Sequence, residues 1–138
     1  MADSFEFEVT IPSDTAKGHE VQEEILQRLQ HGGFPEHDLF GVKLALEEGI
    51  VNAIKHGNGL DPSKNVSVHC SYDGERVIVE IEDEGPGFDP GDVPDPTADE
   101  NLQKPSGRGL MLMKAFMTRV EFNDKGNRVI LEKERSAE

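Results

Sequence analysis

The stretch LALEEGIVNAIKHGN, residues 44–58, decides the fold class because it is typical of a helix with two distinct faces. At about 100° of rotation per residue, the helix expected over 36–56 turns an apolar arc toward a sheet. That arc consists of Val42, Ala45, Leu46, Gly49, Ile50 and Ala53. A neighbouring arc carries the polar side chains Glu48, Asn52, Lys55 and His56. Such a flank is usually only solvated, so this helix alone leaves a binding site and an ordinary surface both open.

A second stretch, VIVEIEDEGPGFDP at residues 77–90, is typical of a strand followed by a tight glycine-rich turn. The apolar row of the strand is Val77, Val79 and Ile81. Because residues two apart share a face, Asp83 continues that buried row and needs hydrogen-bond donors there. The exocyclic amine of adenine is a suitable donor, and Gly85 and Gly87 allow backbone to approach a ligand closely. The alternative is an ordinary turn capped by an aspartate.

The run Gly107-Arg108-Gly109-Leu110 opens a further helix, expected over 108–117. A glycine-rich turn that enters a helix presents free N–H groups and the positive end of the helix dipole, which suits phosphate. Arg108 adds a charge-assisted contact. An ordinary helix start explains the same residues, because a lone GxG is a weak signal.

Residues 85–107 combine several prolines with little periodicity. The prolines are Pro86, Pro90, Pro94, Pro96 and Pro105. A structureless stretch of more than about 15 residues in a compact domain is usually a functional lid or disordered. We expect a lid over a ligand at 85–107, with disorder as the alternative.

The remaining elements complete an α+β fold. We expect a strand over 5–11, a helix that ends at Gly32-Gly33, a strand over 66–72 and a closing hairpin over 120–131. One face of each strand is apolar and the other mostly polar, which predicts a two-layer α/β sandwich. The expected sheet is mostly antiparallel and mixed, with about five strands and three helices on one face. Gly57 is expected to cap its helix in the left-handed conformation, and 1–138 is expected to form a single domain.

Composition restricts the function classes. The chain has 138 residues and a formal net charge of −14, so a nucleic-acid binder, which needs a basic surface, is not expected. No membrane helix or secretory leader is expected, and one cysteine, Cys70, excludes an internal disulfide. A reducing cytoplasm is the expected location. An acidic protein that binds nucleotide needs local cations, which Lys55, Lys104, Arg108, Lys114 or Mg²⁺ would supply.

Taken in order, these motifs resemble the three sequence boxes of the Bergerat-fold ATPases, the group that contains gyrase and the histidine kinases. The resemblance covers nearly the whole chain. Its clearest parts are NAIKHG at 52–57, DEGPGFDP at 83–90 and GRGL at 107–110. Within that group, the chain is most similar to the small anti-sigma-factor serine/threonine protein kinases of bacterial partner-switching systems.

The resemblance implies specific roles for individual residues. Asn52 is expected to bind the Mg²⁺ that bridges the ATP phosphates, and Glu48 to act as general base, with Glu47 as the weaker candidate. Asp83 is expected to bind adenine. The other expected nucleotide contacts are Lys55, His56, Gly85, Gly87, Gly107, Arg108, Gly109 and Leu110. Two departures from the family pattern are Gly49, where alanine is expected, and Thr118-Arg119, where an acidic pair is expected.

Two functions follow as hypotheses from different classes. The first is an ATP- and Mg²⁺-dependent kinase that phosphorylates a serine or threonine of a regulatory protein, an anti-anti-sigma-type antagonist. The second is a binding module without catalysis, which sequesters a sigma factor or a similar regulator when ATP is bound. An isolated catalytic half of a histidine kinase is a third possibility. A homodimer is implied by the resemblance alone, and the sequence does not identify the partner or its acceptor residue.

Overall fold

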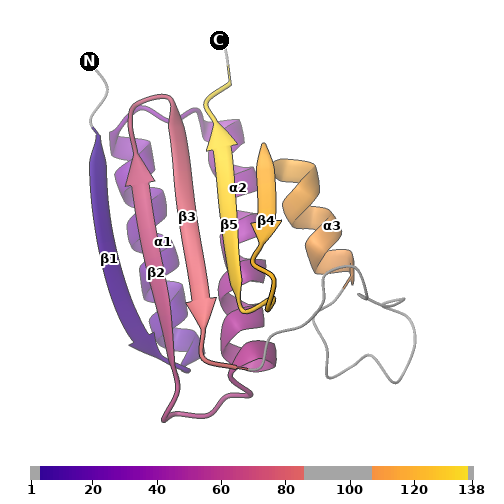
Figure 1. The fold of residues 1–138 in the computed structure, drawn as a ribbon. Helices are drawn as coiled ribbons and strands as arrows, with labels where there is room; N and C mark the ends of the chain where they lie inside the picture. Colours follow the sequence, from indigo (N-terminus) through magenta and orange to yellow (C-terminus); the bar gives the residue numbers. More distant parts are fainter. Residues whose placement is uncertain (1–3, 86–106, 137–138) are drawn as a thin grey trace.

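The computed structural model describes residues 4–85 and 107–136, with the backbone alone for 107–110. Its elements, in chain order, are β1 (Phe5–Pro12), α1 (Thr15–His31), α2 (Glu36–Val51), the π-helical turn η1 (Asn52–Gly57), β2 (Asn65–Tyr72), β3 (Arg76–Asp83), α3 (Gly107–Phe116), β4 (Arg119–Phe122) and β5 (Arg128–Glu134). Figure 1 shows the strands as one sheet in front of the helices. No helix in these described parts of the chain is long and apolar enough to cross a membrane.

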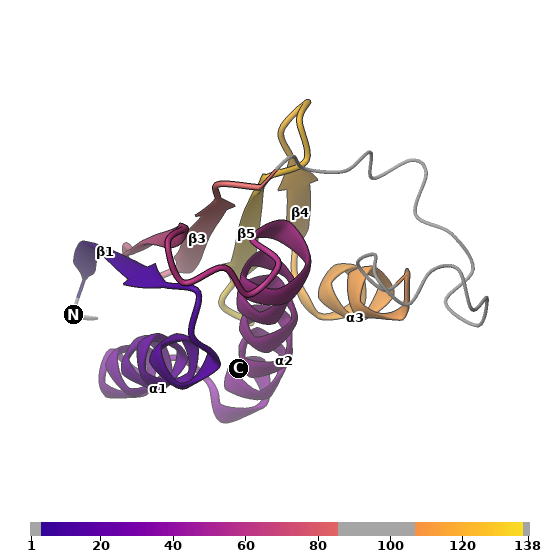
Figure 2. The ribbon, with the colours of Figure 1, turned by 90° about the horizontal axis from the view of Figure 1, so that it is seen from below.

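The sheet has five strands in the order β1-β2-β3-β5-β4. All four pairings between these strands are antiparallel. The helices lie on one side of the sheet, with α3 beside α2 (Figure 2). The expected α+β sandwich is therefore confirmed, although no parallel pair occurs among the described strands. Because β5 lies between β3 and β4, the β4–β5 turn comes next to the end of β3.

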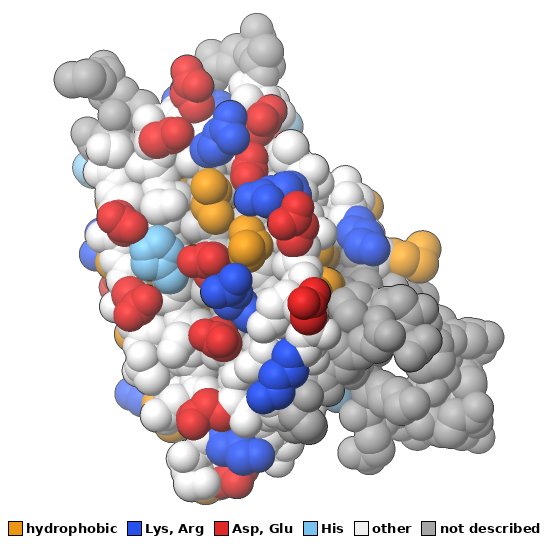
Figure 3. All heavy atoms as spheres, viewed as in Figure 1, with side chains coloured by type: hydrophobic (Ala, Val, Ile, Leu, Met, Phe, Trp, Pro, Cys, Tyr) orange, Lys and Arg blue, Asp and Glu red, His pale blue; other side chains and the backbone are white. Residues whose placement is uncertain are grey.

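The two faces of the sheet differ as their alternation predicts. The apolar rows of β2 and β3 are buried beneath the helices: Val66, Val68, Cys70, Val77, Val79 and Ile81 are each at most 1% exposed. Acidic and basic side chains intermix over the opposite face (Figure 3). There Arg76 and Arg119 each lie 3.1 Å from Glu132. The helices thus cover the apolar face, and ion pairs occupy the other.

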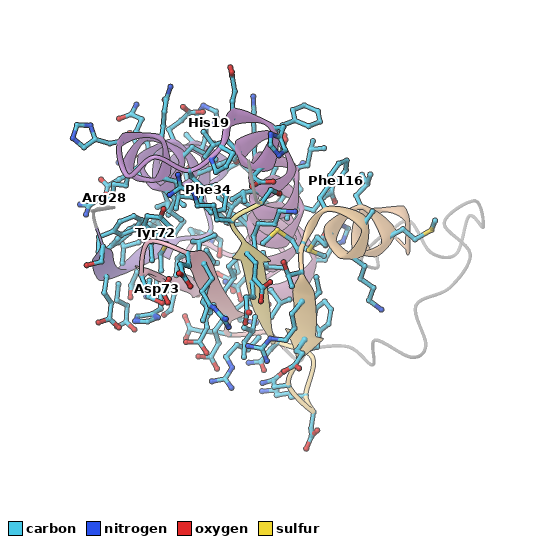
Figure 4. All side chains as sticks on the ribbon, turned by 90° about the horizontal axis from the view of Figure 1, so that it is seen from above. His19, Arg28, Phe34, Tyr72, Asp73 and Phe116 are labelled. Atoms are coloured by element: carbon cyan, nitrogen blue, oxygen red, sulfur yellow. The ribbon has the colours of Figure 1, made fainter. Side chains whose placement is uncertain are left out.

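Helix α1 begins and ends where side-chain chemistry favours it. Asp14 is the N-cap, and its carboxylate accepts a hydrogen bond from the Ala16 N–H at 2.8 Å. At the other end the chain turns through Gly33, whose φ is +85°. Phe34 then meets Tyr72 edge-on, with ring centroids 5.8 Å apart (Figure 4). This aromatic contact closes the core at the end of β2 that lies away from the C-terminus of β3.

Helix α2 does not continue to position 56 as an α-helix. It ends at Val51 and continues as the wider turn η1. There the Asn58 N–H donates to the Ala53 carbonyl oxygen, five residues back, at 2.9 Å. The expected left-handed cap at Gly57 is wrong, because Gly57 lies inside this turn. The left-handed residues are instead Gly59 and Leu60, with φ of +61° and +60°.

Candidate functional site

A cavity opens toward solvent where η1, the end of β3 and the β4–β5 turn meet. Its lining consists of Gly49, Asn52, Ala53, His56, Gly57, Ile81, Asp83, Met113, Phe122, Gly126, Asn127, Arg128 and Val129. Asn52 and Asp83, which are distant in sequence, therefore border the same space. Most of the other lining side chains are apolar or absent, as is typical of a small-molecule site with a few polar groups.

Two glycines allow η1 and the end of β3 to touch. A Cβ added at Gly57 would overlap the Asp83 carboxylate, and a Cβ added at Gly85 would overlap the carbonyl group of Gly57. Any side chain at either position would separate the helix from the strand. Gly85 was selected from the sequence as a site residue. Gly57 was not selected, because the helical pattern does not show that Asp83 packs against it.

Asp83 lies at the end of the buried row, as its alternation predicts, and is 9% exposed. Its Oδ1 accepts a hydrogen bond from the Gly85 N–H at 2.8 Å. Burial raises the pKa of this carboxyl above its ordinary value of 3.8, and the nearby charge of Glu82 acts in the same direction, against the Gly85 hydrogen bond. A half-satisfied carboxylate beside an apolar cavity is suited to accept a hydrogen bond from a ligand amine.

Asp83→Asn is expected to stabilise the protein without nucleotide at pH 7. A raised pKa means that the folded state disfavours the ionised form, so stability falls as pH rises from 3.8 through the folded pKa. Asparagine keeps the acceptor for Gly85 and has no charge to bury. Thermal unfolding at several pH values should show a higher Tm for the variant at neutral pH and a shrinking difference below pH 4.

Asp73→Asn is the matched control, for which the opposite change in stability at pH 7 is expected. The exposed Asp73 carboxylate accepts from the N–H groups of Glu75 and Arg76, both at 2.9 Å, and these bonds lower its pKa. Its stabilising contribution is present above its unfolded pKa and is lost as pH falls, so this variant should unfold at a lower temperature at pH 7. A Tm for Asp83→Asn below that of the parent would contradict the prediction.

Asn58 holds the end of β3 beside the cavity, and it was not identified as a site residue from the sequence. It is 3% exposed. Its Nδ2 donates to Ser13 Oγ and to the Asn65 carbonyl oxygen, both at 3.0 Å, and its Oδ1 accepts from the Glu84 N–H at 2.8 Å. One carboxamide thus joins the ends of β1 and β3 to the start of β2. Sequence periodicity gives no signal for such a residue, because its partners come from three separate segments.

The β4–β5 turn forms the other wall of the cavity, and sequence analysis did not assign it to the site. The lining residues from this hairpin are Phe122, Gly126, Asn127, Arg128 and Val129. Gly126 has φ of +80°, which glycine adopts without strain. The available signal was the turn itself, but only the pairing of β3 with β5 shows that this turn lies beside Asp83.

The polar arc of the first helix divides between the cavity and its surroundings. Asn52 and His56 line the cavity, whereas Lys55 is exposed and is not part of the lining. Glu48 is half-buried outside the lining. Burial and the neighbouring Glu47 raise the pKa of Glu48 above 4.5, and His56 acts against them.

Several predicted contacts fall outside what the structure describes. Gly87 and nearly all of the expected lid, 86–106, lie outside the described residues. Gly107 and Gly109 begin α3, as expected for GRGL, but the side chains of Arg108 and Leu110 are also outside the described set. Their contacts with nucleotide remain predictions.

Among the described residues of the cavity lining, Asn52 offers an oxygen donor for a hard metal ion. Its carboxamide oxygen is a ligand type that Mg²⁺ accepts, and Mg²⁺ bound to phosphates needs few protein ligands. No group of three His, Cys, Asp or Glu side chains arranged to hold a metal occurs within 4–85 and 107–136. The donor set therefore fits a metal that arrives with a phosphate ligand rather than an all-protein metal centre.

Known proteins resemble this chain over most of its length. Residues 11–133 match the family model described as the histidine kinase-like ATPase domain. The chain is 32% identical over 102 residues to an anti-sigma F factor of Clostridium perfringens, which covers 70% of this chain and 72% of that protein. It is 29% identical over 96 residues to the serine-protein kinase RsbW of Bacillus licheniformis, which covers 64% and 59%.

A solved structure shows the same fold. The crystal structure of the RsbU and RsbW domains of a Mycobacterium tuberculosis protein superposes with a TM-score of 0.65 at 16% sequence identity. The match covers 95% of this chain and 31% of that one. At this identity the likeness concerns the fold alone.

Proposed function

The chain belongs to the histidine kinase-like ATPase domain family, and on that premise we propose that it is an anti-sigma-type serine/threonine protein kinase. It binds ATP with Mg²⁺ in the cavity and transfers the terminal phosphoryl group to a regulatory protein. The observation that carries the proposal is that Asn52 and Asp83 line one cavity. A purine needs a hydrogen-bond acceptor at one side and a triphosphate needs a metal-binding oxygen at the other, and these residues supply both.

In this proposal each side chain has a distinct task. Asp83 accepts a hydrogen bond from the adenine amine, and the apolar side chains of Ile81 and Met113 contact the base. Asn52 would hold Mg²⁺, which would neutralise phosphate charge. The hydroxyl oxygen of the partner attacks the γ-phosphorus, its proton passes to Glu48, and the bond to ADP breaks. Positioning and charge neutralisation account for most of phosphoryl-transfer catalysis, so this small set is sufficient.

The non-catalytic binding module remains the second candidate, because Glu48 is not among the residues that line the cavity. In that reading nucleotide occupancy alone creates a surface for a sigma factor or a similar regulator. If Glu48 reaches the acceptor hydroxyl only in the complex with the partner, it also lies outside the cavity when the partner is absent. The position of Glu48 is therefore compatible with the kinase function as well. The implied homodimer is a separate proposal, which sedimentation with and without ATP would test.

Transfer of labelled γ-phosphate separates the two functions. The chain is incubated with Mg²⁺, labelled ATP and an antagonist-type protein from the same genome, and both the complex and the phosphoprotein are measured. Phosphoserine or phosphothreonine on the partner is the expected result. A stable ATP-dependent complex without phosphoprotein would favour the binding module, and absence of ATP binding would contradict both.

A further inference from the structure

We propose that Asn127 is a positioning residue that holds the Asp83 main chain and thereby sets the selectivity of the cavity for the base. This inference rests on the proposed function, because it concerns how the same cavity distinguishes nucleotides. Both residues line the cavity. They approach it from different elements, Asp83 from the end of β3 and Asn127 from the turn before β5.

Two hydrogen bonds join these residues. The Asp83 N–H donates to the Asn127 carbonyl oxygen at 2.9 Å, and the Asn127 Nδ2 donates to the Asp83 carbonyl oxygen at 3.0 Å. The strand pairing ends one step earlier, at Glu82 and Arg128. The pair therefore extends the ladder by one position, with a side-chain amide in place of one main-chain donor.

The main-chain donor of Asn127 is engaged elsewhere. Its N–H donates to Asn123 Oδ1 at 3.0 Å, and the same oxygen accepts from the N–H groups of Gly126 at 2.8 Å and Arg128 at 3.2 Å. In a regular antiparallel ladder the Asn127 N–H would donate to the Asp83 carbonyl oxygen, but here it donates to Asn123 within the turn. Without the Asn127 carboxamide, the Asp83 carbonyl would lose its partner at the edge of the cavity.

The orientation of both carboxamides follows from their neighbours. Asn123 Oδ1 accepts three main-chain N–H groups, so its Nδ2 must face the other way, where it donates to Asn127 Oδ1 at 2.8 Å. With Asn127 Oδ1 occupied in this way, its Nδ2 is directed at Asp83. The matching of donors to acceptors thus fixes the orientation of the Asn123 and Asn127 carboxamides, and with it the hydrogen bond from Asn127 to Asp83.

The functional consequence concerns the Asp83 carboxylate. Within residues 4–85 and 107–136, the hydrogen bond of the Asp83 side chain is local, to Gly85 two residues later, so the direction of the carboxylate depends on the main chain that carries it. Asn127 bonds that main chain from the turn before β5, whereas Gly57 lies against the carboxylate itself. A base-reading acceptor must be held within a fraction of an ångström to discriminate, and Asn127 provides that restraint.

The test compares ATP with inosine triphosphate, which carries the same triphosphate but has a 6-oxo group in place of the adenine amine. Calorimetry at pH 8 with Mg²⁺ gives the ratio of the two dissociation constants, and phosphate and metal contributions cancel in it. The parent is expected to bind the inosine nucleotide roughly 10- to 100-fold more weakly, as for a lost hydrogen bond to a charged group. Asn127→Ala is expected to reduce that ratio to about threefold or less by the same reasoning.

Two further variants separate positioning from general loss of stability. Asn127→Asp keeps the Oδ1 acceptor for Asn123 and replaces the Nδ2 donor with a charged oxygen that repels the Asp83 carbonyl oxygen, so it should lose selectivity as the alanine variant does. Cys70→Ala leaves a void in the core of β2, outside the cavity lining, and should retain the parental ratio. A parental ratio in both Asn127 variants would overturn this inference while leaving the proposed function intact. A parent protein that does not bind ATP would overturn both.

Discussion

Replacing Glu48 with glutamine is expected to lower the rate of phosphoryl transfer about 10²- to 10⁴-fold, the usual contribution of a general base. ATP affinity should change little, because Glu48 lies outside the cavity lining. Glutamine has nearly the shape of glutamate but accepts no proton at neutral pH. Single-turnover transfer to the partner, measured beside calorimetric ATP binding, separates the two effects.

Glu47→Gln is the matched control. Glu47 adjoins Glu48 in sequence but is exposed, whereas Glu48 is half-buried, so its replacement removes the same charge from the same helix without removing the proposed base. Its transfer rate should stay within about threefold of the parent, as for an exposed substitution. Equal losses in both variants would assign the effect to general electrostatics, and parental transfer in Glu48→Gln would remove Glu48 from the mechanism.

The raised pKa of Glu48 adds a pH signature to the same experiment. Burial is the main cause of the rise above 4.5, followed by repulsion from Glu47. A general base must be ionised, so transfer should decline as pH falls through this raised pKa rather than through 4.5. Removing the Glu47 charge lowers the pKa of Glu48, and the acid limb of the profile should move to lower pH in Glu47→Gln.

Sequence patterns predict the helices and strands well because each buries one face. The apolar arc of α2 is buried as expected, with Ala45 and Leu46 fully inaccessible. The strand alternation that places Asp83 in the buried row is equally direct, since a period of two leaves no other face for it. The family resemblance then connects Asn52 with Asp83, a pairing that neither periodicity alone provides.

The parts that sequence did not predict depend on contacts between distant segments. The turn η1 replaces the end of the α-helix that the pattern over 36–56 predicts, and it brings Gly57 against Asp83. Asn58 and Asn127 likewise have meaning only through partners on other strands. Local propensity specifies which helices and strands form. The junction between η1 and the end of β3 is specified by tertiary hydrogen bonds and by the two glycines, Gly57 and Gly85.

Under the proposed function, the same cavity would also explain how an acidic protein accommodates a nucleotide. The formal net charge is −14, yet Asp83 is the one carboxylate among the described residues that line the cavity, and Arg128 is part of the same lining. The burial that raises the pKa of Asp83 would also make the proposed hydrogen bond to a base amine stronger than it would be in water. The remaining requirement is a positive charge at the triphosphate, which the proposal assigns to Mg²⁺ held by Asn52.

Asn52→Ala is therefore expected to weaken Mg²⁺-dependent ATP binding about 100-fold, equivalent to about 2.8 kcal/mol at 1.4 kcal/mol per tenfold change. Alanine favours helix formation more than asparagine does, so the loss should occur in a folded protein. Calorimetry with and without Mg²⁺ measures the effect, and affinity in the presence of a chelator should be nearly unchanged.

Two comparisons give this result its meaning. Asn52→Asp retains a ligand oxygen and should keep a larger share of the Mg²⁺ dependence than alanine, because a carboxylate also coordinates Mg²⁺. Cys70→Ser, at a buried site away from the cavity, should bind Mg²⁺ and ATP with parental affinity. If Asn52→Ala binds ATP as the parent does and still responds to Mg²⁺, the metal is held by other groups, and the cavity loses the residue that distinguishes a triphosphate site from a pocket for a bare purine.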